Sequence, residues 1–293
     1  MNKIQKWGGL SVVLCLIFVG RPVKAQVPTE LDGGYKLVWC DEFDKPGRPD
    51  STNWIFEEGF VRNYEWQWYQ PQNATVTEDG ILLITARNEI RPNPYYKEGA
   101  RDWRRSRKQI ECTSACVLSR GLREFLYGRI LVRARIPAAR GSWPAIWMLG
   151  NGNGYGWPSC GEVDIMEFYE KDGVRSILAN ACWGNDQGGS VWDEGVIPFT
   201  HFTAKDSLWA TQFHEWRMDW DKDYIRIYLD NELLNEIDLS QTYNGTHGRN
   251  ENPFHTPMYI LLNLAMGSNG GRVDAQAMPM RYEIDYVRVY QRP

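Results

Sequence analysis

Three acidic residues, Glu162, Asp164 and Glu167, lie close together in one apolar segment, GEVDIMEF at 161–168. Burying a carboxylate costs free energy unless the group is paired or used in chemistry. Two neighbouring carboxyl groups can supply a nucleophile and a proton donor to the same reaction. The segment therefore predicts a catalytic centre. Spacing alone leaves two alternatives open, an acidic edge strand with a solvated face and a calcium site.

The backbone must bend for these three acids to act together. On a regular strand Glu162 and Asp164 share one face, and Glu167 points to the other. A β-bulge at Ile165-Met166 would add one residue and return Glu167 to the first face. The two glutamates could then reach the separation of roughly 5–5.5 Å that retaining glycoside hydrolysis requires. In that case we expect Glu162 to be the nucleophile. Glu167 would be the acid/base, with a pKa raised by the negative charge of Asp164.

Alternation of apolar and polar residues with period two dominates the rest of the chain. In residues 128–137, Ile130, Val132 and Ala134 face one way, and arginines 129, 133 and 135 face the other. Further strands are predicted at 80–86, 224–229, 232–239, 258–265 and 282–291, a short turn of helix at 207–213, and a long loop at 88–107. These many short strands predict an all-β sandwich of two antiparallel sheets, in a single domain over residues 26–293.

Residues 1–25 are predicted to be a signal peptide. Lys3 and Lys6 precede an apolar run over 10–19, and residues 23–25 (VKA) offer a small-x-small cleavage site. The run is shorter than the about 20 residues that cross a bilayer, so we expect no transmembrane span. We therefore expect a secreted or periplasmic protein, and leave attachment to the cell surface open.

The predicted mature chain is acidic. Residues 1–25 hold four of the 33 basic residues and no acid, which leaves 29 basic against 37 acidic residues, a net charge of −8. This balance disfavours nucleic acids and anionic membranes as partners. The full chain contains fourteen Trp and fifteen Tyr, which is more than a core of this size needs, and flat aromatic faces suit sugar rings.

From about Tyr35 to Gln291 the chain resembles a glycoside hydrolase family 16 catalytic domain of the laminarinase-like branch. The matching segments are WCDEFD at 39–44, NYEWQWY at 63–69, WPAIWML at 143–149, the signature E-x-D-x-x-E at 162–167 and DYVRVY at 285–290. The resemblance implies a β-jelly roll with a concave cleft. It also implies retention of configuration, with Glu162 as nucleophile and Glu167 as acid/base.

The resemblance also suggests where a sugar chain binds. Trp143 and Trp147 are four apart on a predicted strand, so they share a face, which the family directs into the cleft. Trp157 is expected at the cleft mouth, and Asn63 matches a sugar-binding position of related enzymes. Trp183 is also taken as substrate-binding. It ends the segment NACW, residues 180–183, which departs from the laminarinase pattern because a histidine is common on this strand.

We expect no cofactor in catalysis, but a structural calcium ion is a possible ligand. No CxxC pair or histidine cluster predicts zinc, and catalysis by two carboxyl groups needs no cofactor. Relatives often carry a structural calcium, for which Glu42 and Asp285 are the candidate ligands. We expect a monomer that binds β-glucan polysaccharide and oligosaccharides.

The leading hypothesis is a retaining endo-β-glucanase that hydrolyses laminarin-type β-1,3-glucan by double displacement. The alternatives are a mixed-linkage β-1,3/1,4-glucanase, an algal galactan hydrolase and a glucan-binding protein without activity. The last would lack the catalytic acids, and this chain keeps all three.

Overall fold

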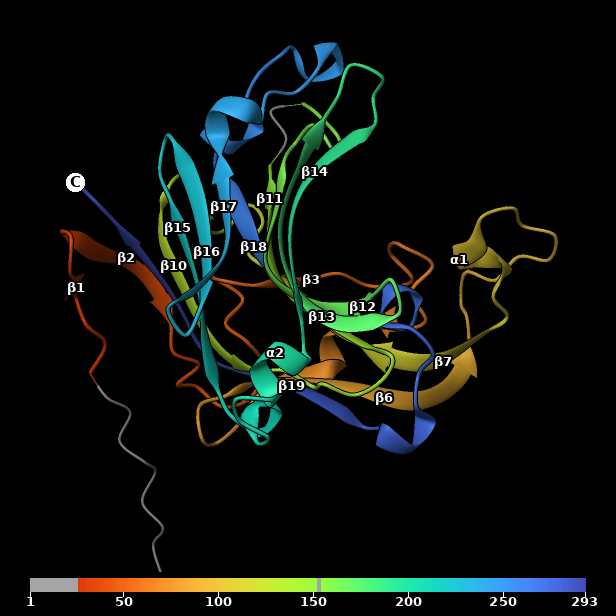
Figure 1. Cartoon of the computed structure of the whole chain (residues 1–293). Coiled ribbons are helices and arrows are strands. Elements are labelled where there is room, and N and C mark those ends of the chain that lie inside the picture. The colour runs from red at the N-terminus through yellow and green to blue at the C-terminus, as the bar shows by residue number, and fades with distance from the viewer. Residues whose placement is uncertain (1–25, 152–153) are drawn as a thin grey trace, which may run out of the picture.

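The computed structural model describes residues 26–151 and 154–293, which form two packed β-sheets (Figure 1). The signal peptide predicted for residues 1–25 lies outside the described residues. The larger sheet has eleven strands: β1 (Glu30–Leu31), β2 (Tyr35–Asp41), β4 (Trp68–Tyr69), β5 (Ala74–Val76), β6 (Leu82–Pro92), β7 (Gln109–Ser114), β10 (Gly128–Arg135), β15 (His214–Trp220), β16 (Tyr224–Leu229), β17 (Glu232–Asp238) and β19 (Met280–Gln291).

The smaller sheet has eight strands and carries the acidic segment. Its strands are β3 (Ile55–Phe56), β8 (Cys116–Leu118), β9 (Glu124–Phe125), β11 (Ser142–Gly150), β12 (Glu162–Lys171), β13 (Val174–Gly184), β14 (Ser190–Pro198) and β18 (Met258–Met266). Along it the order is β14-β13-β12-β11-β18-β8-β3, with β9 beside β18. Every pairing in the two sheets is antiparallel except that of β4 with β7, so the predicted all-β sandwich is confirmed.

Helical structure in the described chain is limited to short pieces. The α-helices are α1 (Trp103–Ser106) and α2 (Thr200–Thr203), and the 3₁₀ turns are η1 (Pro71–Asn73), η2 (Trp209–Thr211), η3 (Leu239–Gln241), η4 (Thr246–Gly248), η5 (Pro253–His255), η6 (Ser268–Gly270) and η7 (Ala275–Ala277). None of these helices has the length and apolarity of a membrane span. The turn of helix predicted at 207–213 corresponds to η2.

Strand β10 shows how alternation divides the residues between core and surface. Ile130, Val132 and Ala134 are fully buried between the sheets. The arginines between them form ion pairs on the outer face of the larger sheet: Arg129 with Asp219 at 2.6 Å, Arg133 with Asp285 at 2.6 Å and Arg135 with Glu283. The predicted two-faced pattern is therefore confirmed.

The segment at 88–107 differs from its prediction as one long loop. Residues 88–92 continue β6, and they pair with β7 across an irregularity between Asn88 and Arg91. Only the part beyond residue 92 leaves the sheet, and it contains the short helix α1, which projects beyond β12 and β13 in Figure 1. Residues 88–92 therefore form part of a strand because they pair with β7, although their sequence lacks a regular strand pattern.

The predicted bulge is present in β12. Against β11, Asp164 faces Trp147 and Met166 faces Ile146, so Ile165 is an additional residue. Against β13 the register shifts between Asp164 and Glu167 in the same way. The consecutive side chains Ile165 and Met166 are both fully buried in the core. The bulge therefore turns two adjacent apolar residues inward, and Glu167 shares the outer face with Glu162 and Asp164.

This geometry predicts that Ile165→Ala and Met166→Ala both destabilise the fold. Each truncation should lower the free energy of unfolding by about 2–5 kcal/mol, because both side chains lie in the packed core. In chemical denaturation, Val174→Ala serves as the control, because Val174 is an exposed residue at the start of β13, and it should change stability by less than about 0.5 kcal/mol. A straight strand would expose one of the pair, so a negligible effect at either position contradicts the bulge.

Candidate active site

A cleft with a volume of about 820 Å³ crosses the outer face of the eight-stranded sheet. Its floor is formed by β14, β13, β12, β11 and β18, and its rim by Arg62, Asn63 and Glu65 and by residues 268–269. The lining residues are Arg62, Asn63, Glu65, Trp143, Ala145, Trp147, Leu149, Trp157, Glu162, Asp164, Glu167, Tyr169, Lys171, Asn180, Trp192, Glu194, Asn263, Ala265, Ser268 and Asn269. All three acids of the bulged segment thus open into one cleft.

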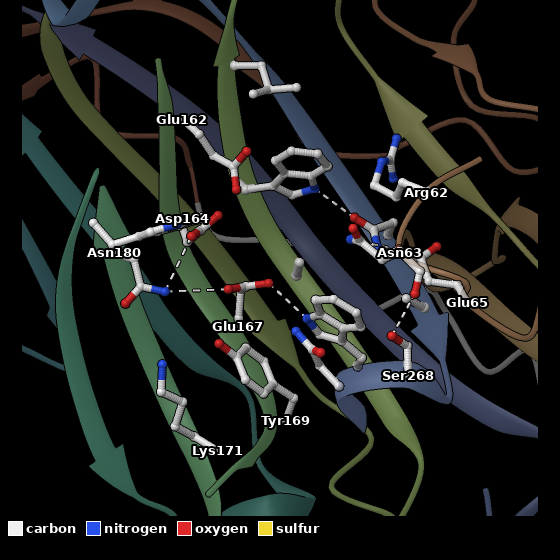
Figure 2. Close-up of a pocket in the computed structure, with 18 of the residues that line it drawn as sticks. Arg62, Asn63, Glu65, Glu162, Asp164, Glu167, Tyr169, Lys171, Asn180 and Ser268 are labelled. Carbon is white, nitrogen blue, oxygen red and sulfur yellow. Dashed lines mark hydrogen bonds between the residues drawn. The ribbon is translucent and has the colours of Figure 1, made fainter. Parts of the chain in front are cut away.

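Each of the two glutamates receives a hydrogen bond from a different indole. The Trp157 indole N–H donates to Glu162 Oε2 at 2.8 Å. The Trp143 indole N–H donates to Glu167 Oε1, also at 2.8 Å. Figure 2 shows Asp164 between them, with the Asn180 amide directed at both Asp164 and Glu167, at 3.4 and 3.5 Å. This arrangement orients the two glutamates separately.

Burial dominates the protonation of this trio. It raises the pKa of Glu162 to about 7, and the Trp157 hydrogen bond and the Arg62 charge act in the opposite direction. The pKa of Glu167 is raised to about 8, by burial first and then by the charge of Glu162. The pKa of Asp164 is also raised, by burial and by the charges of both glutamates. The pKa of Glu162 is therefore the lower of the two, and Glu167 is the glutamate that keeps its proton to higher pH.

The cause of the Glu167 shift differs from the sequence-based expectation. The charge of Asp164 was expected to raise the pKa of Glu167. Instead, burial and the Glu162 charge raise it, and the hydrogen bond with Asp164 lowers it. The reason is that Asp164 is nearly fully buried, which favours its own protonated form.

Four of the five predicted sugar-binding residues line the cleft. Trp143 and Trp147 share the outer face of β11, as their spacing predicted, and Trp157 and Asn63 lie at the rim. The Trp147 indole donates to the Asn263 side chain at 2.6 Å, which fixes its ring on the floor. Trp157 is 55% exposed, so one face of its ring is open to a ligand.

The prediction for Trp183 is wrong. Along β13, Ala179, Ala181 and Trp183 point into the core, and Trp183 packs edge-on against Phe254. The cleft face carries Asn180 instead. Successive side chains of a strand point to opposite faces. Residues 180 and 183 are three positions apart, so they lie on opposite faces of β13.

Several cleft residues were not recognised from sequence. Tyr169 and Lys171 follow Glu167 at intervals of two, so the bulge that places Glu167 places them as well. Asn263 is the polar residue within the apolar run of β18, and this contrast is the sequence signal that marks it. Arg62, Glu65, Trp192, Glu194 and Ser268 come from distant segments, and no local pattern links them to β12.

The predicted calcium ligands do not fit a calcium ion. Glu42 accepts two hydrogen bonds from the Arg288 guanidinium, at 2.8 and 2.9 Å. Asp285 pairs with Arg133 at 2.6 Å. Among the described residues no group of three His, Cys, Asp or Glu is arranged to hold a metal. The negative charges of Glu42 and Asp285, which a cation would balance, are balanced here by Arg288 and Arg133.

Comparison with known proteins identifies relatives of similar size. The family model for glycosyl hydrolases family 16 matches residues 60–288. A beta-glucanase from Rhodothermus marinus is 33% identical over 308 residues, which cover 99% of this chain and 97% of the relative.

Two solved structures are similar in fold and sequence. One comes from work on the endo-acting O-glycanases with which prominent members of the human gut microbiota initiate mucin breakdown. It has a TM-score of 0.78 and 34% identity, over 90% of this chain and 94% of that one. The laminarinase catalytic domain of Thermotoga maritima MSB8 has a TM-score of 0.71 and 32% identity, over 88% of this chain and 99% of that one. The chain therefore belongs to glycosyl hydrolases family 16 and is a glycoside hydrolase.

Proposed function

We propose that this protein is a retaining endo-β-glucanase that cleaves laminarin-type β-1,3-glucan, with Glu162 as nucleophile and Glu167 as acid/base. The observation that carries the proposal is the bulge in β12, which brings two glutamates with different hydrogen-bond donors onto one cleft face. Two carboxyl groups of this kind are what double displacement uses. No cofactor is required in either step.

Each step assigns one task to each carboxyl group. First, the Glu162 carboxylate attacks the anomeric carbon, Glu167 protonates the departing glycosidic oxygen, and a glycosyl ester forms on Glu162. Second, the Glu167 carboxylate takes a proton from water, which attacks the same carbon and releases Glu162. Trp157 stabilises the charge on Glu162 before attack, and Trp143 stabilises the charge on Glu167 after proton transfer.

Endo action is supported by the breadth of the cleft. It crosses five adjacent strands, from β14 to β18, which at about 4.8 Å per strand spacing is roughly 19 Å. This span accommodates several sugar rings of a chain that continues beyond the cleft. We also propose, from the sequence, that the protein is exported and acts as a monomer.

A second candidate substrate is an O-linked glycan chain such as mucin carries. One comparison favours it: the structure from the work on O-glycanases has a higher TM-score than the laminarinase, 0.78 against 0.71. The carboxyl chemistry would be the same, and only the sugars that contact the cleft floor would differ.

A panel of purified polymers tests the substrate proposal. Laminarin, barley mixed-linkage glucan, agar-type galactan and mucin O-glycans would be incubated with the protein, and products resolved by size and linkage. We expect laminarin to yield a ladder of oligosaccharides in early time points, as internal cleavage requires. Cleavage of mucin O-glycans with laminarin untouched would replace the first candidate by the second.

Substitution of the two glutamates should separate their roles. Glu162→Ala should lower kcat by at least about a thousandfold. Glu167→Ala should lower kcat on the polymer by about 10²–10⁴, yet spare an aryl glycoside whose leaving group needs no proton. Azide should rescue Glu167→Ala with retained configuration and Glu162→Ala with inverted configuration, as followed by NMR of the products. The opposite pattern would exchange the two assignments.

The indole hydrogen bonds predict two different changes in the pH profile. Activity needs Glu162 ionised and Glu167 protonated, so kcat/KM should peak between the apparent pKa values of about 7 and about 8. Trp157→Phe removes a donor to Glu162, which raises its pKa and moves the acidic limb to higher pH. Trp143→Phe raises the pKa of Glu167 in the same way and moves the alkaline limb to higher pH.

Trp192→Phe provides the control for these profiles. Its indole donates to the Ser190 hydroxyl and not to a catalytic carboxyl group, so neither limb should move. If Trp157→Phe and Trp143→Phe shift the same limb, the two carboxyl groups are not oriented separately.

A further inference from the structure

The cleft rim at residues 61–66 is held from outside by a separate segment of the chain. This rim loop carries Arg62, Asn63 and Glu65 into the cleft. The segment that contacts it is the arm, residues 93–108, which leaves the sheet after β6 and contains α1. The arm includes most of residues 88–107, which the sequence predicts as one long loop.

Two arginines of the arm donate hydrogen bonds to four carbonyl groups of the rim loop. Arg104 donates to the Val61 carbonyl from Nε at 3.1 Å and from Nη2 at 2.6 Å. Arg107 donates to the carbonyl of Tyr64 at 2.9 Å, to that of Glu65 at 2.6 Å and to that of Trp66 at 3.4 Å. A single guanidinium therefore holds three successive peptide groups.

The rim loop needs such support because its backbone is strained. Asn63 and Tyr64 both have φ of 55°, the left-handed region that non-glycine residues seldom occupy. Such conformations cost free energy and persist only where neighbouring contacts impose them. The Ser268 hydroxyl donates to another carbonyl of this turn, that of Asn63, at 2.6 Å (Figure 2). The carbonyl groups thus point to the arm and to η6, and the Asn63 side chain lies on the cleft side.

The arm is itself rigidly built at the point of contact. The Arg107 guanidinium packs over two neighbouring aromatic rings, 4.6 Å from the centroid of Phe60 and 4.7 Å from that of Trp103. The buried Asn93 amide donates to the carbonyls of Arg104 and Arg107, at 2.9 and 2.8 Å, which closes the base of the arm. Arg107 is therefore positioned before it meets the rim loop.

We propose that Arg107, assisted by Arg104, is a positioning residue that sets the conformation of the rim loop and hence the affinity of the cleft for the sugar chain beside Asn63. This inference rests on the proposed function only in assuming that a sugar chain occupies the cleft. The arm acts through backbone carbonyls and does not contact Glu162 or Glu167. Its removal should weaken binding and leave the chemical step nearly intact.

The test compares Arg107→Ala, Arg107→Lys and Arg104→Ala with Arg105→Ala, which removes a charge from an exposed position of the same helix. Lysine is a point donor and cannot reproduce a planar fork that reaches three carbonyls, so Arg107→Lys should resemble Arg107→Ala. Arg104 is 45% exposed in its side chain, so Arg104→Ala keeps a folded variant available if the Arg107 variants do not fold.

Two measurements are made on each variant. Hydrogen exchange of peptides covering residues 60–67 should become faster in the Arg107 and Arg104 variants, with β12 and β13 unchanged. Oligosaccharide Kd, measured in the Glu162→Ala background, should rise about tenfold for the Arg107 variants, whereas kcat on the polymer cleaved by the wild type stays within about twofold. Arg105→Ala should match the parent in both.

Unchanged exchange at 60–67 would overturn the proposal, and so would faster exchange with unchanged Kd. A fall in kcat at constant Kd would also overturn it, because it would place Arg107 in the chemical step. If the wild-type chain binds no β-glucan or O-glycan oligosaccharide, the proposed function fails separately, and the exchange measurement alone decides whether the arm sets the rim.

Discussion

The candidate active site depends on one additional residue in one strand. Without the bulge at Ile165-Met166, strand geometry would place Glu167 in the core, where an ionisable group has no partner and no substrate. With it, the core gains two adjacent apolar side chains, and the cleft gains its second glutamate. Stability and the proposed catalysis therefore depend on the same local distortion, because the packing of Ile165 and Met166 in the core stabilises the bulge.

The second constraint is electrostatic. Three carboxyl groups within one strand repel one another and are poorly solvated, and burial raises the pKa of each. The fold offsets this cost with neutral donors, two indoles and the Asn180 amide, rather than with a cation in direct contact. A lysine or arginine at that distance would hold both glutamates ionised, and the proton that the proposed acid donates would be lost. Neutral donors orient the groups and leave their protonation unequal.

Arginine serves as the structural cation elsewhere in the molecule. On the outer face of the larger sheet it pairs with the two acids for which calcium had been predicted, and at the cleft rim it binds carbonyl groups of a strained loop. The planar guanidinium suits both tasks, because it donates several hydrogen bonds in fixed directions. The cleft is consequently supported by residues that lie well outside it.

Local sequence determined the features that depend on period and spacing. Alternation identified the core face of β10, the acidic segment required a bulge, and the spacing of Trp143 and Trp147 placed both rings on one side of β11. The same rule, applied to β13, would have assigned Trp183 to the core.

Only the tertiary structure decided what depends on contacts between distant segments. Glu42 and Arg288, which form an ion pair, are 246 positions apart in the sequence. Arg107 is 41 to 43 positions from the rim-loop residues whose carbonyl groups it binds. The pKa order of the glutamates likewise depends on burial by several strands. Period and spacing are properties of a single strand and can be read along the chain. Contact and burial arise only when separate strands pack together.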